Sequence, residues 1–425
     1  MKPTNAWVSK TALFLTSQMF SLFGSSVVGY VVIWYITLET SSAWMMTVSI
    51  LCTFLPQLLV SLFAGVWADR YSRKLLIMLS DLFTALCTLV LAVFFLLGVR
   101  SFTLLFIISA LRSLGAGVQA PAVGAILPQL VPTEKLTKVN GISNALNSAL
   151  MLLSPAIGGL LLAKVDMGYA LLVDVATALL AVCIMLFLKV QKAERSEESA
   201  STLGDLKKGL RYTMEHPILR RLMIFYLLFF FLVSPAAFLT PVMVERSFGP
   251  EVWRLTANEM LWTAGSLLGG VLISVWGGFK NRLATMALAT AGFGVTFALL
   301  GVAGNFYLYL GIMLVSGIFM PVFGTAETVL IQETVEEQML GRVFSIVQII
   351  ITGSMPLGMV VFGPLGDIIK IEYLLIGTGI LMVLLTPFIL SSKASVKAVG
   401  SSSAGADTEE APASAERAAD DDAAR

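Results

Sequence analysis

The sequence predicts an all-α membrane protein with twelve transmembrane helices arranged as two six-helix bundles. The chain has 425 residues, of which 57% are hydrophobic and only 13% are charged, whereas ordinary soluble domains carry about 25% charged residues. The apolar residues gather into long runs, and a helix that spans a bilayer needs about 20 such residues. A polar stretch in the middle of the chain separates the runs into two sets of six.

Each apolar run predicts one membrane-spanning helix. In chain order they cover approximately residues 11–37, 43–66, 75–98, 102–127, 140–163, 168–189, 219–244, 256–278, 283–303, 305–331, 342–365 and 371–391. The first run is too long for the apolar core of a signal peptide and has no suitable cleavage site, so we expect it to be retained as a helix.

The polar stretch predicts a linker between two halves. It is charged and Ser-rich at first, and then has the pattern of a short amphipathic helix from Leu203 to Met214. We therefore expect four parts, namely an N-terminal half (1–190), a cytoplasmic linker (191–217), a C-terminal half (218–392) and a tail (393–425). The tail is rich in Ala, Ser, Asp and Glu and has no aromatic residue, so it is predicted to be disordered.

The basic residues indicate how the chain is oriented in the membrane. If the N-terminus is cytoplasmic, the outward loops hold few of the 28 Lys and Arg residues, namely Arg100, Lys164, Arg246, Arg254 and Lys370. Arg112 lies inside a span, and all the others lie in inward segments. This bias predicts that both termini are cytoplasmic. Membrane orientation accounts for the positions of the basic residues, so nucleic-acid binding is not expected.

The residue types exclude several kinds of chemistry. Cys52, Cys87 and Cys183 lie in apolar spans without CxxC spacing, which argues against a disulfide or a metal site. His216 is the only histidine and precedes a proline in the linker, so no Ser/His/Asp arrangement is expected. No Gly-rich loop ends in Gly-Lys-Ser/Thr, so no nucleotide is expected as a cofactor or energy source. Transport would have to draw on an ion or substrate gradient.

A short cationic loop lies between the second and third runs. It reads Gly65-Val-Trp-Ala-Asp69-Arg70-Tyr-Ser-Arg73-Lys74-Leu-Leu-Ile. It resembles the signature loop between helices 2 and 3 of the major facilitator superfamily, G-x-L-A-D-R-x-G-R-K/R-x-x-L/I, with Trp67 and Ser72 in place of the usual Leu and Gly. The resemblance covers approximately residues 1–390 and implies the fold of that superfamily. The competing interpretation is that the basic residues only anchor the chain on the cytoplasmic side.

The resemblance implies that this loop is a conformational latch. Its residues would be Gly65, Asp69, Arg70, Arg73 and Lys74. Because a helix N-terminus carries partial positive charge, we expect Asp69 to contact the start of the eleventh span, near 341–344, when the protein faces outward. The three cations are expected to pair with acids of neighbouring helices and with lipid headgroups.

The two halves repeat weakly but in register. Trp67 and Arg73 recur as Trp276 and Arg282 between spans 8 and 9, where Gly278 replaces the acid of the first copy. Three further residues recur at a constant offset, with Leu127, Gln129 and Glu134 matching Leu330, Gln332 and Glu337. Such parallel repeats agree with the superfamily.

Ionisable residues inside spans are functional candidates, because burying them costs free energy. Glu327 is the first candidate for proton coupling, because an acid shielded from water takes up a proton more readily. The alternative is that Glu327 is a helix-end carboxylate, together with Glu333, Glu336 and Glu337. Arg112 is expected to face the cavity or an acid, either as a coupling residue or as a structural arginine satisfied by backbone carbonyls or by Asp81.

The other acids in the spans are assigned lesser roles. Asp81 is predicted to be a salt-bridge partner of the latch rather than a proton carrier, and so a secondary member of the charge relay. Asp174 and Glu259 lie near the outer ends of their spans and are expected to be ordinary interfacial charges.

The substrate cavity is expected between spans 1, 4, 7 and 10, with spans 2, 5, 8 and 11 at its sides. Its predicted polar and aromatic residues are Gln18, Tyr30, Trp34, Asn144, Asn147, Tyr226, Phe230 and Gln348. An apolar pocket with a few placed polar groups suits a bulky amphipathic solute. Pro235 and Pro241 are predicted to kink the seventh span.

Less specific motifs indicate a branch of the superfamily. The run 121–134, with Asn140-Gly141, resembles the bacterial drug-export branch that includes macrolide efflux and enterobactin export proteins. Pro155, Gly158 and Gly159 resemble the span-5 motif of antiporters, in which small residues allow close helix packing.

The resemblance implies a monomeric exporter in the bacterial inner membrane that works by alternating access. Its partners would be a hydrophobic, drug-like small molecule, protons in antiport, and membrane lipid. The alternative is an exporter of a lipid such as a lysophospholipid, or of a siderophore. An alternative of another class is a sensor or scaffold that keeps the fold but transports nothing.

Overall fold

A computed structural model describes residues 6–190 and 202–391. In those residues the chain forms α-helices and one short 3₁₀ turn, η2 (Thr133–Lys135). The helices of the first half are α1 (Ala6–Thr40), α2 (Ala43–Arg70), α3 (Arg73–Leu96), α4 (Phe102–Leu130), α5 (Leu136–Lys164) and α6 (Met167–Leu186). The linker contains α7 (Thr202–Glu215). The helices of the second half are α8 (Pro217–Phe238), α9 (Thr240–Phe248), α10 (Val252–Trp276), α11 (Arg282–Val302), α12 (Phe306–Thr334), α13 (Glu337–Ile368) and α14 (Ile371–Leu390).

The described chain contains 12 helices long and apolar enough to cross a membrane, which confirms the predicted all-α membrane fold. The amphipathic helix expected at 203–214 is α7. The predicted tail and the Ser-rich start of the linker lie outside the described residues.

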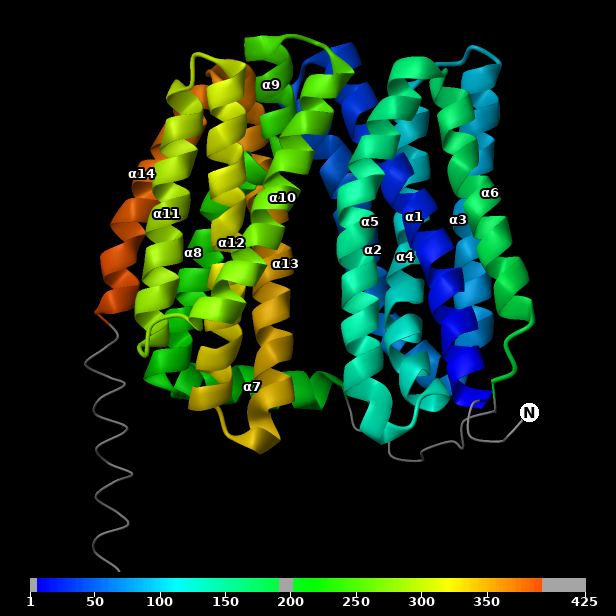
Figure 1. Cartoon of the computed structure of the whole chain (residues 1–425), viewed down its shortest axis with the longest axis horizontal. Helices are drawn as coiled ribbons and strands as arrows, with labels where there is room; N and C mark the ends of the chain where they lie inside the picture. The colour runs from blue at the N-terminus through cyan, green and yellow to red at the C-terminus, as the bar shows by residue number, and fades with distance from the viewer. Residues whose placement is uncertain (1–5, 191–201, 392–425) are drawn as a thin grey trace, which may run out of the picture.

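The helices form two bundles, α1–α6 and α8–α14, and α7 lies across one end below the second bundle (Figure 1). We call this end the linker end and the opposite end, where α9 lies, the far end. The first described residue and the end of α14 both lie at the linker end (Figure 1).

Polar side chains fix where several helices begin. Ser42, Ser72 and Ser101 each precede a helix and accept a hydrogen bond from a backbone N–H of its first turn. Such caps satisfy N–H groups that the helix itself leaves without a partner. The polar residues in the short loops between spans therefore set the helix boundaries.

The seventh span is broken as predicted. It consists of α8 and α9, which meet at Leu239, and its two prolines lie on either side of that break. Pro235 lies in the last turn of α8, and Pro241 lies in the first turn of α9, where a missing N–H is tolerated.

The structure reproduces the sequence repeat between the halves. Arg73 donates to the carbonyl of Ala68, five residues earlier, at 3.1 Å, and Arg282 donates to the carbonyl of Gly277 at 3.1 Å. Arg73 also reaches the carbonyl of Ala125 on α4, while Arg282 reaches Glu333 on α12. Arg73 thus links the end of α2 to α4, and Arg282 links the end of α10 to α12 in the same way.

Candidate functional site

The two halves are joined at the far end by a carboxylate and a helix N-terminus. Asp367, in the last turn of α13, accepts hydrogen bonds from the backbone N–H groups of Ala43 (2.8 Å) and Trp44 (2.9 Å), and from the hydroxyl of Ser42 (2.8 Å). The first turn of a helix carries partial positive charge, so a carboxylate there is stabilising. Asp367 of the C-terminal half therefore caps α2 of the N-terminal half.

Arg246 on α9 completes this contact. Its guanidinium forms an ion pair of 2.6 Å with Asp367 and donates through Nε to the carbonyl of Ser41 at 2.9 Å. Both side chains of the pair are partly exposed. We call Asp367, Arg246 and the 41–44 turn the far-end clasp.

Small residues let the helices of the two halves approach one another beside the clasp. A Cβ atom at Gly363 on α13 would overlap the hydroxyl of Thr47 on α2, and one at Gly159 on α5 would overlap that of Thr256 on α10. The predicted role of Gly159 in close packing is thus confirmed. The bundles approach one another at the far end and spread toward the linker end (Figure 1).

The predicted latch lies at the linker end, where the bundles are spread. Lys74 donates to the carbonyls of Leu186 (3.0 Å) and Leu188 (2.8 Å) at the end of α6, so it binds a helix C-terminus rather than an acid. Gly65 and Arg70 are exposed on α2. Asp69 lies in the last turn of α2, and its side chain is outside those that the structure describes, so its contact with α13 remains a prediction.

A buried ion pair lies inside the N-terminal half. Arg112 on α4 pairs with Asp174 on α6 at 2.9 Å, and only 1% of the Asp174 side chain is exposed. Asp174 also accepts hydrogen bonds from Ser25 (3.0 Å) and Thr88 (2.7 Å). The expectation that Asp174 is an interfacial charge is wrong, because α6 turns this side chain into the bundle. Arg112 does face an acid, as predicted, but that acid is not Asp81.

Asp81 lies apart from the latch. It is buried on α3 and accepts hydrogen bonds from the hydroxyl of Ser21 on α1 and the amide of Gln119 on α4, each at 2.6 Å. Both donors are neutral. The predicted salt bridge between Asp81 and the latch is therefore wrong. Sequence reasoning missed Gln119, whose only signal was an amide in an apolar span.

Glu327 is buried on α12, one turn beyond Phe323, against which Tyr226 packs. Among the described residues, neither its Oε1 atom nor the hydroxyl of Tyr226 has a hydrogen-bond partner. Glu333, by contrast, pairs with Arg282 near the helix end. The alternative of a shared helix-end cluster is thus excluded for Glu327.

The predicted cavity residues fall into three groups. Gln18 and Asn147 line a cavity of about 180 Å³ between α1, α4 and α5. Asn144 and Gln348 are exposed on α5 and α13. The remaining four are Tyr30, which is half-buried on α1, and Trp34, Tyr226 and Phe230, which are fully buried.

The buried members of that set belong to one hydrophobic cluster, which is formed mostly by the C-terminal half and includes Trp34 of α1. Tyr226 and Phe230 pack around Phe323 of α12, with ring centroids 6.3 and 6.1 Å away. The prediction that these two residues line a cavity is therefore wrong in this conformation. Their aromatic character serves packing between α8 and α12.

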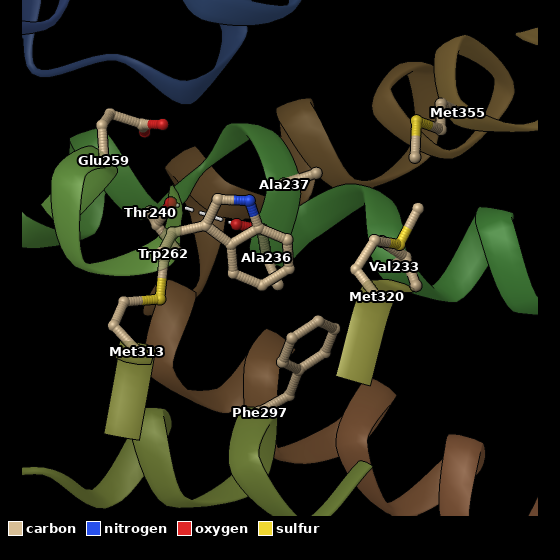
Figure 2. A pocket seen from close by; sticks show the side chains of 10 residues that line it. All are labelled: Val233, Ala236, Ala237, Thr240, Glu259, Trp262, Phe297, Met313, Met320 and Met355. Atoms are coloured by element: carbon tan, nitrogen blue, oxygen red, sulfur yellow. Dashed lines mark hydrogen bonds between the residues drawn. The ribbon is translucent and has the colours of Figure 1, made fainter. Parts of the chain in front are cut away.

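A second cavity, of about 110 Å³, lies within the C-terminal half. Figure 2 shows its lining, in which the ring of Phe297 points toward the indole of Trp262, and the carboxyl group of Glu259 lies on the other side of that indole. The remaining lining residues are Val233, Ala236, Ala237, Thr240, Met313, Met320 and Met355. The expectation that Glu259 is an ordinary interfacial charge is wrong, because it borders this internal space.

Comparison with known proteins places this architecture among transporters. The family model of the Major Facilitator Superfamily matches residues 14–350. Macrolide efflux protein A of Streptococcus pyogenes is 26% identical over 387 residues, which cover 90% of this chain and 96% of that protein. The staphyloferrin A transporter of Staphylococcus aureus is 25% identical over 84% of this chain and 90% of that protein.

A solved structure shares the fold. It is the crystal structure of a bacterial homologue of the iron transporter ferroportin in an inward-facing state, with a TM-score of 0.71 and 16% sequence identity. The match covers 90% of this chain and 98% of that chain. The chain thus shares the fold of that protein.

Proposed function

Because this chain belongs to the Major Facilitator Superfamily, we propose that it exports an amphipathic, drug-like small molecule in antiport with protons. The similarity to macrolide efflux protein A along nearly the whole chain carries the proposal. By the distribution of basic residues, the linker end faces the cytoplasm of a bacterial inner membrane, with both termini inside. One chain contains both halves of the proposed transport path, so we expect it to work as a monomer.

The inter-half contacts support alternating access. The far-end clasp holds the bundles together on the outer side, and the bundles spread toward the cytoplasm. This is an inward-facing arrangement, ready to accept substrate from the cell or the inner leaflet. Closing the cytoplasmic side would bring the latch residues of α2 toward the start of α13, where Asp69 would take the role that Asp367 has at the far end.

Buried carboxyl groups support proton coupling. Asp81 has two neutral hydrogen-bond donors, and Glu327 has an oxygen atom without a partner among the described residues. Acids buried inside membrane spans without a cationic partner are candidates for carrying protons. In the proposed cycle the acids take up protons from the outside after the substrate leaves, and release them to the cytoplasm when the next substrate binds. The ion pair between Arg112 and Asp174 holds a positive charge in place inside the N-terminal half, beside the proposed proton path.

The test is efflux of a radiolabelled macrolide and of ethidium from an export-deficient bacterium, with and without a protonophore. The Asp69→Asn, Asp81→Asn and Glu327→Gln variants run beside the wild type. Glu215→Gln, which changes an exposed acid on the linker helix α7, is the matched control. Protonophore-sensitive efflux that the first three variants lose and the control keeps would support the proposal.

A siderophore is the second candidate substrate, favoured by the similarity to the staphyloferrin A transporter. Absence of efflux for both compounds, at normal membrane expression, would contradict the drug-export proposal. Assays with a radiolabelled siderophore and with lysophospholipid would then separate the remaining transport alternatives. If the protein transports none of these substrates, the alternative of a sensor or scaffold would be favoured.

A further inference from the structure

The cavity of the C-terminal half has one ionisable group in its wall. Of its ten lining residues, nine are apolar or neutral, and Glu259 alone can carry a charge. The hydroxyl of Thr240 is already used, because it donates to the carbonyl of Ala236 at 3.0 Å. Figure 2 shows Glu259 and the indole ring of Trp262 bordering the same space. An apolar chamber with a single acid selects for a group that is both apolar and positively charged.

A chain of hydrogen bonds orients the acid. Tyr309 on α12 donates to the Oδ1 atom of Asn258 at 2.9 Å, and the Nδ2 atom of Asn258 donates to Oε1 of Glu259 at 3.2 Å. Tyr309 and Asn258 are fully buried. Glu259 is only half-buried, so its carboxyl group is held in place while remaining accessible from the cavity.

No cation of the described protein neutralises Glu259. The nearest arginine in sequence, Arg254, pairs instead with Glu251 at 3.1 Å and lies over the ring of Trp253. An ionised carboxyl in an apolar wall is costly unless it meets a positive charge. The carboxyl group of Glu259 is thus available to pair with a positively charged group that enters the cavity from outside the protein.

The rest of the wall fits an organic cation. Trp262 and Phe297 offer aromatic faces, which attract ammonium and related cations. Met313, Met320 and Met355 offer flexible, polarisable thioethers that adapt to varied apolar shapes. A metal ion or a hydrated inorganic cation would find one carboxylate and no further charged ligand among these residues.

The cavity is small, and one side of it lies toward the other half. A volume of about 110 Å³ is below the roughly 300–1,000 Å³ of sites that enclose whole drug-sized ligands. Thr256, one turn before Glu259 on α10, contacts Gly159 on α5, so this side of the cavity lies toward the N-terminal half. A larger ligand could place one arm in the cavity and leave its remainder between the halves.

We propose that this cavity is a subsite for the positively charged arm of an amphipathic substrate, with Glu259 as its counter-charge. The arm is an alkylated amine or an onium group that carries apolar substituents. This inference rests on the proposed export function and names the chemistry that the transported molecule would carry.

Binding to the purified full-length protein in lipid nanodiscs tests the subsite. The two probes are benzyltrimethylammonium, a permanent cation with a small onium head, and neopentylbenzene, its neutral isostere in which carbon replaces the nitrogen, both measured by equilibrium dialysis. We expect Glu259→Gln to weaken binding of the cation by about 10- to 100-fold, since a hydrogen-bonded or ionic contact to a charged group contributes about 1.5–3 kcal/mol. Binding of the neutral probe should change less than about twofold, and Glu259→Asp should restore part of the cation affinity.

Glu215→Gln is the matched control and should bind both probes as the wild type does. Equal cation affinity in the wild type and Glu259→Gln would overturn the proposal. So would an equal loss for both probes, which would indicate a purely structural effect, or no binding of the cation to the wild type. Dialysis needs no proton gradient, so it tests the subsite independently of transport. If the protein exports neither macrolide nor ethidium but still binds the cation in a Glu259-dependent way, the export proposal would be contradicted and the subsite proposal would stand.

Discussion

Asp367 on α13 accepts a hydrogen bond of 2.8 Å from the backbone N–H of Ala43 in the first turn of α2, which ties the second half to the first. The bond combines a full negative charge with the partial positive charge of a helix N-terminus. It lies at the end opposite the signature loop, where the resemblance implies the same kind of contact for Asp69. The two contacts would close opposite ends of the transport path in turn.

Asp367→Asn is expected to weaken the far-end clasp and shift the protein toward opening at that end. The side chains of Asp367 and Arg246 are partly exposed, so we expect about 1 kcal/mol, or about a fivefold change in population. Spin labels at Lys164 and Tyr307, exposed at the far ends of the two halves, would report the change as a longer inter-label distance. The labels require a background in which Cys52, Cys87 and Cys183 are replaced.

Asp166→Asn is the control for that experiment, because Asp166 is a far-end acid that pairs with Arg100 within its own half, at 3.1 Å. An unchanged distance distribution in Asp367→Asn, or the same change in both variants, would contradict a role of the clasp in gating.

Gly363→Ala is expected to force the halves apart at the far end, because its added methyl group would overlap Thr47. A second substitution, Thr47→Ala, should relieve most of the overlap, because it removes the hydroxyl and leaves only the Cβ atom close to the added methyl group, and should bring the labels back toward their wild-type distance. Gly353→Ala on the same helix meets open space and should change nothing. If Thr47→Ala gave no rescue, the contact between α2 and α13 would not be what holds this end closed.

The two buried acids of the N-terminal half should respond differently to loss of charge. Asp174→Asn leaves Arg112 buried without its counter-charge, so we expect it to lower the free energy of unfolding by about 3–5 kcal/mol. Asp81 is not paired with a cation, so Asp81→Asn should change the free energy of unfolding much less. The same variant should abolish protonophore-sensitive efflux. Thermal unfolding in detergent and the efflux assay measure the two effects. Equal destabilisation by both variants would count against separate roles for these acids.

Glu327→Met should separate stability from function in the second half. The buried Oε1 atom has no partner among the described residues, so an apolar side chain of similar length is expected to raise the free energy of unfolding by about 1 kcal/mol. The same variant should lose proton-coupled efflux, since methionine cannot carry a proton. A less stable protein that still exports would show that Glu327 is a packing residue.

The positions of the spans could be predicted because the cause is local. Every backbone polar group inside a bilayer must be satisfied within the segment, so a run of about 20 apolar residues has few choices other than a helix. The repeat of Arg73 as Arg282 was also visible, and the structure gives both residues the same carbonyl contact five positions earlier.

The pairing of buried polar residues could not be predicted in this way. Sequence position placed Asp174 and Glu259 near the ends of their spans, but the rotation of α6 turns Asp174 onto Arg112, and the rotation of α10 turns Glu259 into a cavity. Rotation about a helix axis depends on how neighbouring helices pack, and in spans apolar on nearly all sides the hydrophobic pattern gives little indication of it.

The sequence by itself therefore determined the number of spans, their order and the break in the seventh span, because each follows from the hydropathy and backbone chemistry of a short segment. Only the tertiary structure decided that Asp367 caps α2, that Arg112 pairs with Asp174, and that Glu259 borders an internal cavity. Each of these contacts joins side chains from different helices far apart in the chain, and their geometry is set by the packing of all the helices around them.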